Sequence, residues 1–103
     1  MTTSLQTAGA MPGGDRCHLA TPVRFGRGRT DQVGHLVLTN SWLQFRGTVD
    51  LNLSWAEVAT VDNAGRDLIV ALYGTPRTLR FCCQSDDEAA RAGVTARHLA
   101  ALA

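Results

Sequence analysis

The sequence contains no lysine, so arginine supplies all ten basic side chains among its 103 residues. Arginine suits phosphate, because its planar guanidinium can donate two parallel hydrogen bonds to one anion. The arginines are spread along the whole chain, however, and the codon preference of a GC-rich genome is the simpler explanation of such an even bias. The formal net charge is only +1, so no overall field draws the chain onto nucleic acid or an anionic membrane. Any such attraction must be local.

Long apolar runs are also missing. No segment approaches the roughly 20 apolar residues that a membrane-spanning helix requires, and residues 1–14 have neither the basic nor the apolar region of a secretory signal. We therefore expect a cytoplasmic protein, with at most a peripheral contact to a membrane. Residues 1–16 are rich in Thr, Ala and Gly without a repeating apolar pattern, and we interpret them as a flexible leader before a single domain at 17–103.

Cysteine is scarce, and the three cysteines follow no disulfide pattern. Cys82 and Cys83 are adjacent, so on a strand their side chains point to opposite faces, and Cys17 lies far away in the sequence. An odd number without a C-x-x-C spacing argues against a disulfide framework, and we expect reduced, partly buried thiols. A nucleophile made from Cys82 or Cys83 and a distant histidine stays open as an alternative, because a thiolate beside a base is reactive.

The histidines give no sign of a metal site. They lie far apart, and none has a cysteine or a carboxylate at ligand spacing. The three positions are His18, His35 and His98. No nucleotide-binding motif is present either, so we expect neither a metal nor a cofactor.

The sequence does contain short alternating segments separated by turn residues, which is the pattern typical of antiparallel strands with one buried face. The predicted strands are 19–25, 33–38, 42–46, 49–53, 58–61, 68–72 and 79–83, with a loop at 26–31 and a turn at 62–66. Ser54 and Glu57 fit a capping box, and we expect a brief helical turn between the fourth and fifth strands.

The end of the sequence has helical rather than alternating character. Ser85 is a suitable N-cap, and the acidic residues 86–88 favour the positive end of a helix that continues to Ala103. Gly93 costs about 1 kcal/mol inside a helix relative to alanine, so we expect it to mark a close contact with a strand. Apolar positions recur at helical spacing. The predicted stripe is Ala89, Ala92, Ala96, Leu99 and Leu102 or Ala103.

Three segments, in their order along the chain, resemble a known family. Residues 34–45 read GHLVLTNSWLQF, a glycine and an apolar strand ending in Leu-Thr-Asn, followed by a strand ending in apolar-x-Phe; LSWAEV at 53–58 and LRF at 79–81 follow. The order is similar to the GRAM branch of the pleckstrin-homology (PH) superfamily, as a small bacterial single-domain member, over about residues 19–102. This resemblance implies a mainly β fold, a bent seven-stranded antiparallel sandwich or barrel capped by a C-terminal helix. Many such domains bind phosphoinositides or dock proteins, but one fold hosts many functions.

An arginine cluster around a glycine-rich loop is the first candidate site. Alternation and the loop bring Arg24, Arg27 and Arg29 close together, where guanidinium groups and exposed amides could face an anion. The resemblance implies the same position, since phosphoinositide headgroups often sit at the first loop of the superfamily. A solvated arginine loop explains the cluster as well. Each charge near an anionic surface adds only about 1 kcal/mol, so the loop alone predicts weak lipid binding.

A tryptophan on the third strand is the second candidate site. Leu43 and Phe45 alternate onto one face, which leaves Trp42 with Arg46 on the other, and we expect Trp42 to be more exposed than Trp55. Exposed tryptophan is enriched where proteins bind one another, so we predict that Trp42 and Arg46 dock a protein. A sheet edge, or the groove beside the helix, could also accept a peptide as an added strand.

These patterns together predict a non-enzymatic binding or adaptor module. Docking of a protein partner or self-association is the leading expectation, and weak binding of an anionic, phosphoinositide-like lipid comes second. Nucleic acid is not an expected partner, because the chain is nearly neutral and has few aromatic residues. The alternative from another class is a small cysteine-dependent enzyme or redox protein.

Overall fold

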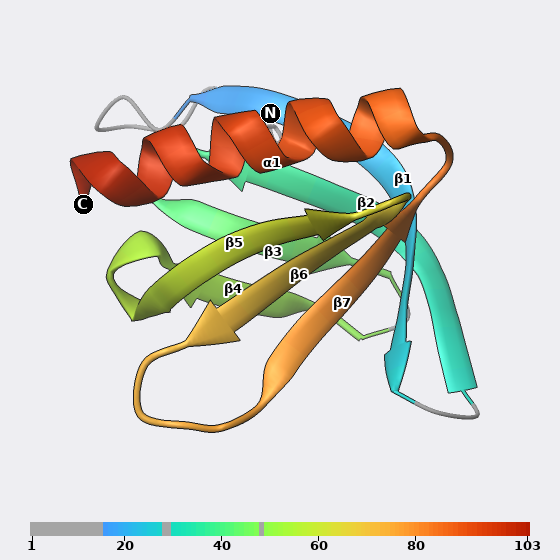
Figure 1. The fold of residues 1–103 in the computed structure, drawn as a ribbon, viewed down its shortest axis with the longest axis horizontal. Helices are drawn as coiled ribbons and strands as arrows, with labels where there is room; N and C mark the ends of the chain where they lie inside the picture. The colour runs from blue at the N-terminus through green and yellow to red at the C-terminus, as the bar shows by residue number, and fades with distance from the viewer. Residues whose placement is uncertain (1–15, 28–29, 48) are drawn as a thin grey trace, which may run out of the picture.

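The computed structural model describes residues 16–27, 30–47 and 49–103. Across these residues the chain forms one antiparallel sheet of seven strands in the order β4-β3-β2-β1-β7-β6-β5 and a C-terminal helix, α1 (Figure 1). The elements are β1 (Cys17–Arg27), β2 (Thr30–Thr39), β3 (Trp42–Arg46), β4 (Leu51–Ser54), the 3₁₀ turn η1 (Trp55–Glu57), β5 (Val58–Ala64), β6 (Asp67–Leu72), β7 (Thr78–Cys83) and α1 (Asp86–Leu102). This is the predicted mainly β fold with its C-terminal helix.

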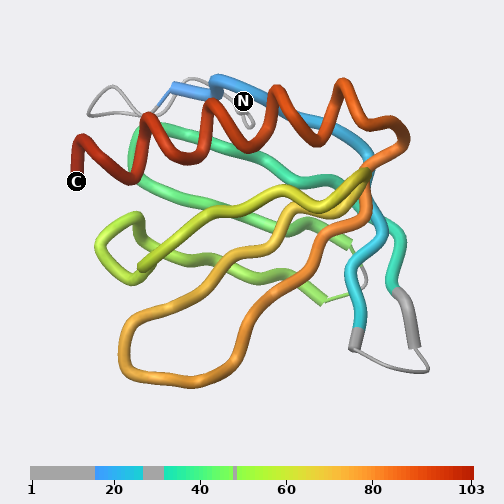
Figure 2. The backbone as a smooth tube through the Cα atoms, in the orientation of Figure 1, coloured from blue at the N-terminus to red at the C-terminus, as the bar shows by residue number. Residues whose placement is uncertain are grey.

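β1 joins the two halves of the sheet. It pairs with β2 from Cys17 to Arg27, but with β7 only over residues 23–25. The two halves therefore diverge on either side of this short junction, which lets the sheet bend around its own core. Figures 1 and 2 show α1 running along one end of the bent sheet, with the β6–β7 loop at the opposite end.

Alternation along the strands places the core between the two halves of the sheet. Leu36, Leu43 and Val70 come from separate strands and are fully buried. All three phenylalanines of the chain meet where β1 and β7 separate: the ring centroids of Phe25 and Phe81 lie 4.8 Å apart, and those of Phe25 and Phe45 lie 5.0 Å apart. Such contacts add about 0.5–1.5 kcal/mol each beyond the burial of the rings.

Two glycines make room for the ring of Phe45. A methyl group at Gly34 would collide with the carbonyl oxygen of Arg46, and one at Gly47 would collide with the Phe45 ring. Because a backbone carbonyl in a sheet cannot move aside cheaply, β2 and the end of β3 can approach this closely only without a side chain at Gly34.

The helix starts and packs as predicted, except at its end. The Ser85 hydroxyl accepts a hydrogen bond from the Glu88 amide at 3.1 Å, and Gly93 is buried. The stripe of Ala89, Ala92, Ala96 and Leu99 is buried. Leu102, however, is 71% exposed and Ala103 is exposed as well, because the last turn of α1 projects past the strands (Figure 1).

Polar contacts fasten α1 to the edge of β5. The side-chain amide of Asn63 donates a hydrogen bond to the Ala89 carbonyl at 2.7 Å, and the Arg97 guanidinium donates to the Val61 carbonyl at 2.9 Å. Gly93 faces the Asn63 side chain, and an added methyl group would collide with it. The expected close contact of Gly93 with a strand is therefore confirmed. The Val61 carbonyl on β5 is therefore already hydrogen-bonded to α1.

Several predicted boundaries were wrong. The loop expected at 26–31 is shorter, because the β1–β2 ladder continues through the pair Arg27↔Thr30, and β5 likewise runs to Ala64 before the turn. Val49 was assigned to the fourth strand, but β4 begins at Leu51 and Val49 is exposed. The alternation of apolar residues does not show where a strand stops pairing with its neighbour, so the ends of strands are hard to predict.

The predicted leader falls outside the described residues apart from Arg16. The Arg16 carbonyl accepts a hydrogen bond from the Asn40 amide at 3.0 Å, beside the start of β1.

The predicted capping box before β5 is present, since the Glu57 carboxylate accepts a hydrogen bond from the Ser54 amide at 3.0 Å. Trp55 is buried and its indole donates to the Thr39 carbonyl at 2.8 Å, which ties η1 to the end of β2.

Candidate functional site

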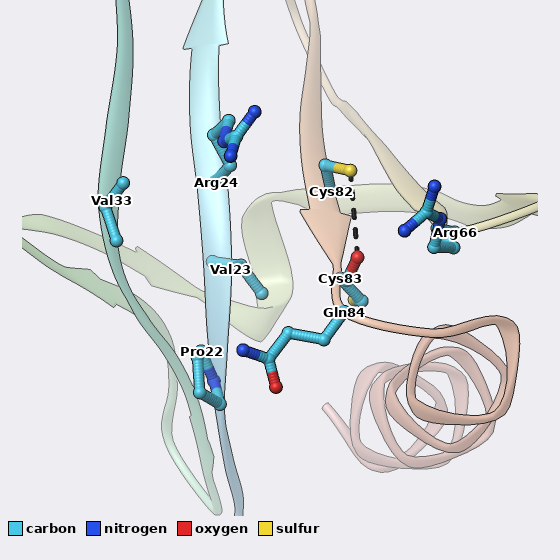
Figure 3. Close-up of a pocket in the computed structure, with 8 residues that line it drawn as sticks. All are labelled: Pro22, Val23, Arg24, Val33, Arg66, Cys82, Cys83 and Gln84. Atoms are coloured by element: carbon cyan, nitrogen blue, oxygen red, sulfur yellow. Dashed lines mark hydrogen bonds between the residues drawn. The ribbon is translucent and has the colours of Figure 1, made fainter.

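A pocket of about 470 Å³ lies on the outer face of the sheet, the face turned away from the core, where β1 meets β7. Figure 3 shows Arg24 and Arg66 on either side of Cys82, and Gln84 reaching from the end of β7 toward Pro22 on β1. The lining residues are Pro22, Val23, Arg24, Val33, Arg66, Cys82, Cys83 and Gln84.

Strand pairing on both sides fixes the position of Arg24. The residue lies opposite Val33 of β2 and opposite Cys82 of β7. Its neighbour Val23 is buried, and because successive side chains on a strand alternate, Arg24 is exposed on the outer face. The backbone that carries this guanidinium is therefore held by a neighbouring strand on each side.

Arg66 reaches the same pocket from the turn between β5 and β6. Gly65 adopts a positive φ of 62°, which glycine tolerates, and this lets the chain reverse within two residues. The Cys83 amide then donates a hydrogen bond to the Arg66 carbonyl at 2.8 Å and holds the turn against β7. Arg66 was not among the site residues predicted from the sequence, because only the pairing of β6 with β7 and of β7 with β1 brings this turn near Arg24.

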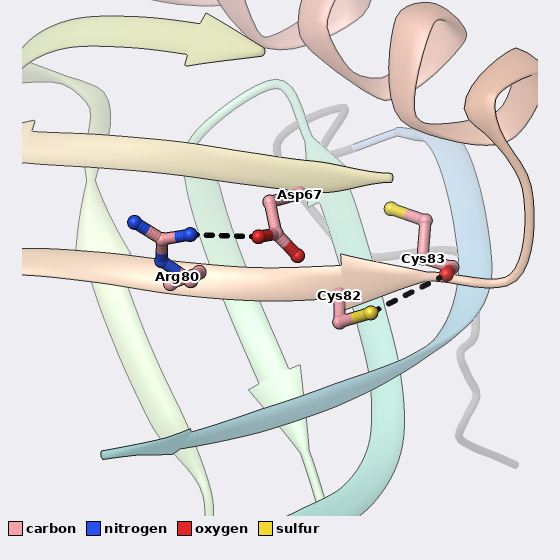
Figure 4. Close-up of polar contacts among 4 residues, drawn as sticks. All are labelled: Asp67, Arg80, Cys82 and Cys83. Carbon is pink, nitrogen blue, oxygen red and sulfur yellow. Dashed lines mark hydrogen bonds and ion pairs between the residues drawn. The ribbon is translucent and has the colours of Figure 1, made fainter. Parts of the chain in front are cut away.

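The pocket carries positive charge. No carboxylate is among its described lining residues, and within the described part of the chain neither Arg24 nor Arg66 makes an ion pair. Asp67, next to Arg66 in the sequence, is instead held by Arg80 at 2.7 Å between carboxylate and guanidinium (Figure 4). This exposed ion pair adds about 0–1 kcal/mol to stability. Its effect on the pocket is to keep the nearest carboxylate bound to another cation.

The two cysteines of the pocket differ in their surroundings. The pKa of the Cys83 thiol is raised from 9.0 to about 11, mainly because the thiol is buried and to a smaller extent because of the charges of Cys82, Glu88 and Asp67. Cys83 therefore stays a neutral thiol near neutral pH, which argues against it as a nucleophile, since the thiolate is the reactive form. Cys82 is partly exposed, and its thiol donates a weak hydrogen bond to the Cys83 carbonyl at 3.7 Å.

Of the three arginines predicted to form the first site, the structure places Arg24 in the pocket. Arg27 ends β1, and only its backbone is described; Arg29 lies outside the described residues. The structure thus groups Arg24 with Arg66, which lies 42 positions further along the chain, and the role of Arg27 and Arg29 stays a prediction.

Trp42 and Arg46 lie on the outer face of β3, as the alternation predicts. Trp42 is 38% exposed and Trp55 only 3%, which confirms the expected difference between the two tryptophans. The Arg46 guanidinium donates a hydrogen bond to the Gln44 side chain at 3.3 Å, and Arg46 is paired in the ladder with His35 of β2. The two predicted docking residues are at opposite ends of the strand, four positions or roughly 13 Å apart.

Two further searches of the described residues were negative. No group of three histidine, cysteine or acidic side chains comes close enough to hold a metal ion. None of the helices in the described part of the chain combines the length and the apolar character needed to cross a bilayer.

No protein-family model and no curated protein matches the sequence. Among 17 matching chains of solved structures, the C-terminal domain of an unknown protein from Leishmania infantum has a TM-score of 0.68 at 17% identity, over 77% of this chain and 81% of that one. An N-terminally truncated linker-DH/PH fragment of p115-RhoGEF has a TM-score of 0.74 at 10% identity, over 86% of this chain and 30% of that one. Identities this low show the fold alone, which is PH-like. The GRAM branch and a bacterial origin stay predictions.

Proposed function

We propose that this PH-like domain is a non-catalytic binding module that docks a protein partner, or a second copy of itself, on the outer face of β1, β2 and β3. The observation that carries the proposal is the exposure of large side chains on that face. Val33 is 71% exposed and Trp42 is 38% exposed, whereas the opposite face of the same strands is buried in the core. Exposed apolar and aromatic side chains next to arginine are typical of surfaces that bind proteins.

Strand register makes these side chains parts of one surface. Val33 lies opposite Arg24, and His35, two residues further along β2, lies opposite Arg46 of β3. The alternation of β2 and β3 puts all of these side chains on the same face. A partner of ordinary size covers about 800 Å² on each side, which is enough to span three strands spaced about 4.8 Å apart.

A contact with anionic lipid is the weaker part of the proposal. Arg24 faces outward, and the β1–β2 hairpin carries two further arginines, Arg27 and Arg29. Three such charges add about 3 kcal/mol at an anionic surface at most. The net charge of +1 already includes these three arginines, so the rest of the protein is net negative and opposes that attraction. Lipid contact of this strength would support docking to a membrane-bound partner rather than hold the domain at a membrane by itself.

Site-specific photo-crosslinking in the native cells tests the docking surface. A photoreactive residue at Val33 on the outer face is compared with one at Val94, which is 63% exposed on α1. We expect a covalent adduct from position 33 and none from position 94. A homodimeric adduct, at twice the 11.0 kDa of the chain, identifies a second copy as the partner.

Two substitutions sharpen this experiment. We expect Trp42→Ala and Arg46→Ser to lower the crosslinking yield at position 33 several-fold, because each removes a contact on the same face. Tyr73→Ala is the matched control, since Tyr73 is an exposed aromatic residue in the β6–β7 loop, outside the outer face of β1–β3. Equal yields at positions 33 and 94, or equal losses in all three variants, would refute docking on this face.

A further inference from the structure

We propose that the pocket between β1 and β7 is a subsite for a phosphate group carried on a side chain of the protein partner, held by Arg24 and Arg66. The inference rests on the proposed docking function and adds to it the chemistry that the partner must present. It starts from an arrangement that the sequence does not show, two arginines from separate elements at one pocket.

The charge of the pocket selects an anion. Both guanidinium groups are exposed, and within the described structure neither has a carboxylate partner, so each can bind a ligand without first breaking an ion pair. Two arginines beside one cavity favour phosphate, because each guanidinium can donate two hydrogen bonds to its oxygens. Phosphate carries close to two negative charges at neutral pH, which matches the two unneutralised arginines.

The backbone presents the two arginines in a fixed arrangement. β1 is paired on both sides at Arg24, and the hydrogen bond from the Cys83 amide holds the Arg66 carbonyl against β7. A site that is already in place before the ligand arrives loses less entropy when it binds. Gln84 adds a side-chain amide that can donate to a phosphate oxygen or to the peptide that carries it.

The remaining surfaces of the pocket suit the rest of a modified side chain. Its volume of about 470 Å³ exceeds that of a phosphate group, so the carrying side chain can enter as well. Pro22 and Val33, both exposed on this face, offer apolar contacts to the carbon atoms of that side chain. The pocket thus combines a basic part and an apolar part, as a phosphorylated residue requires.

The position of the pocket favours a protein over a membrane as the carrier. Residues 22–24 lie in the middle of β1, not at a loop tip that a flat bilayer would touch first. The acidic first turn of α1 begins two residues after Gln84, and its exposed Asp86 and Asp87 would be repelled by an anionic lipid surface. A peptide can instead enter the pocket and continue over Val33 onto the outer face of β2 and β3.

The ion pair between Arg80 and Asp67 supports the subsite indirectly. If Arg80 is removed, the Asp67 carboxylate loses its partner and stands next to Arg66 in the sequence and opposite Cys82 in the ladder. We expect it to compete with the ligand for Arg66. The variant Arg80→Gln should therefore weaken phosphate binding although Arg80 does not line the pocket, and Arg80→Gln combined with Asp67→Asn should restore it.

The test measures binding of peptide libraries with a fixed central phosphoserine, phosphothreonine or phosphotyrosine, each beside its unphosphorylated counterpart. We expect one phosphorylated library to bind at least tenfold tighter than its counterpart. Amide chemical shifts in a ¹⁵N-labelled sample should change at residues 23, 24, 66 and 82–84. Arg24→Gln and Arg66→Gln should each weaken binding roughly tenfold, the effect of losing a charge-assisted hydrogen bond. The control Arg77→Gln, Arg91→Gln has the same net charge as a variant that combines Arg24→Gln with Arg66→Gln. The control should bind like the wild type, since both of its residues are exposed outside the pocket.

Three results overturn the inference. The first is equal binding of phosphorylated and unphosphorylated libraries. The second is equal loss in the pocket variants and in the control, which would show a general charge effect. The third is Arg24- and Arg66-dependent binding to vesicles with phosphorylated inositol lipids but to no peptide library, which would make a lipid the carrier. If one of these three results is obtained while crosslinking from position 33 persists, the proposed docking function stands and only the phosphate subsite falls.

Discussion

At the scale of single residues, neighbours in the sequence can have opposite environments. Cys82 and Cys83 are adjacent and both border the pocket, yet the side chain of Cys82 is partly exposed, whereas that of Cys83 is buried with its pKa raised to about 11. The alternation of a strand is sufficient to predict this division. It is not sufficient to predict which face carries the pocket, because the pocket also needs Arg66, which lies in the turn between β5 and β6.

The raised pKa of Cys83 predicts a loss of stability at alkaline pH. Below pH 9 the thiol is protonated in both the folded and the unfolded chain. Between pH 9 and about 11 the unfolded chain releases a proton that the folded protein keeps, so the free energy of unfolding falls as the pH rises. The full loss is roughly 2–3 kcal/mol for a shift of this size.

Urea unfolding at pH 8, 9.5 and 11 measures this loss. We expect Cys83→Val, which keeps an apolar side chain of similar size, to remove most of the pH dependence between 9 and 11. Cys17→Val is the control, because Cys17 is exposed and its replacement should leave the pH profile unchanged. A Cys83→Val profile identical to that of the wild type would assign the alkaline loss to other groups.

At the scale of elements, the alternation of apolar residues predicted every strand, and their helical spacing predicted the helix. Neither pattern predicted where the elements end. Strand β3 and the strands after β5 were predicted almost to the residue, because each alternates from turn to turn. The β1–β2 hairpin was predicted too short, since glycine and polar residues such as Gly26 and Asp31 continue its ladder through backbone hydrogen bonds alone. Leu102 fits the helical period, but the sheet ends before it and leaves it exposed.

The contact of α1 with β5 predicts an unusual response to a helix-favouring substitution. Gly93→Ala raises helix propensity by about 1 kcal/mol. Its new methyl group would displace the Asn63 side chain, however, and break the hydrogen bonds of Asn63 to Ala89 and to Arg97. Each of these is worth about 1 kcal/mol, so we expect Gly93→Ala alone to destabilise the domain slightly.

A double-mutant cycle isolates this contact. In the background Asn63→Ala the methyl group has room, and Gly93→Ala should then stabilise the domain by up to about 1 kcal/mol. Chemical unfolding of the wild type, both single variants and the double variant gives the coupling energy. Additive effects would mean that residues 93 and 63 do not interact, and the steric explanation would be wrong.

At the scale of the whole molecule, the fold could be predicted and the site only in part. The order of alternating strands and one helix is enough to suggest a PH-like domain, and the comparisons with solved structures agree. The pocket could not be predicted, since Arg24, Arg66 and Gln84 meet only through strand pairing between distant parts of the chain. Pairing between strands that are distant in the sequence depends on the packing of the whole domain, and no local sequence motif indicates it.

The near-neutral charge of the whole molecule predicts weak and salt-sensitive binding to anionic vesicles. We expect a small sedimenting fraction at about 10 mM salt that disappears near 150 mM, because the Debye length shortens from about 30 Å to about 8 Å. Arg27→Ser, Arg29→Ser should abolish it, whereas the control Arg77→Ser, Arg91→Ser should keep most of it. Binding that resists salt would instead show that apolar insertion or a specific headgroup site contributes.

The short junction between β1 and β7 has a consequence for how the chain reaches its fold. The strands β1–β4 and β5–β7 each form a run of neighbours in sequence, and such hairpins assemble locally and quickly. The pair Arg24↔Cys82, by contrast, joins residues 58 positions apart, and it can form only after Cys82 has been synthesised. We expect the meeting of the two halves to set the folding rate, as for other topologies rich in non-local contacts. Until that step is complete, the edges of β1 and β7 are unpaired, and the newly made chain is most exposed to aggregation.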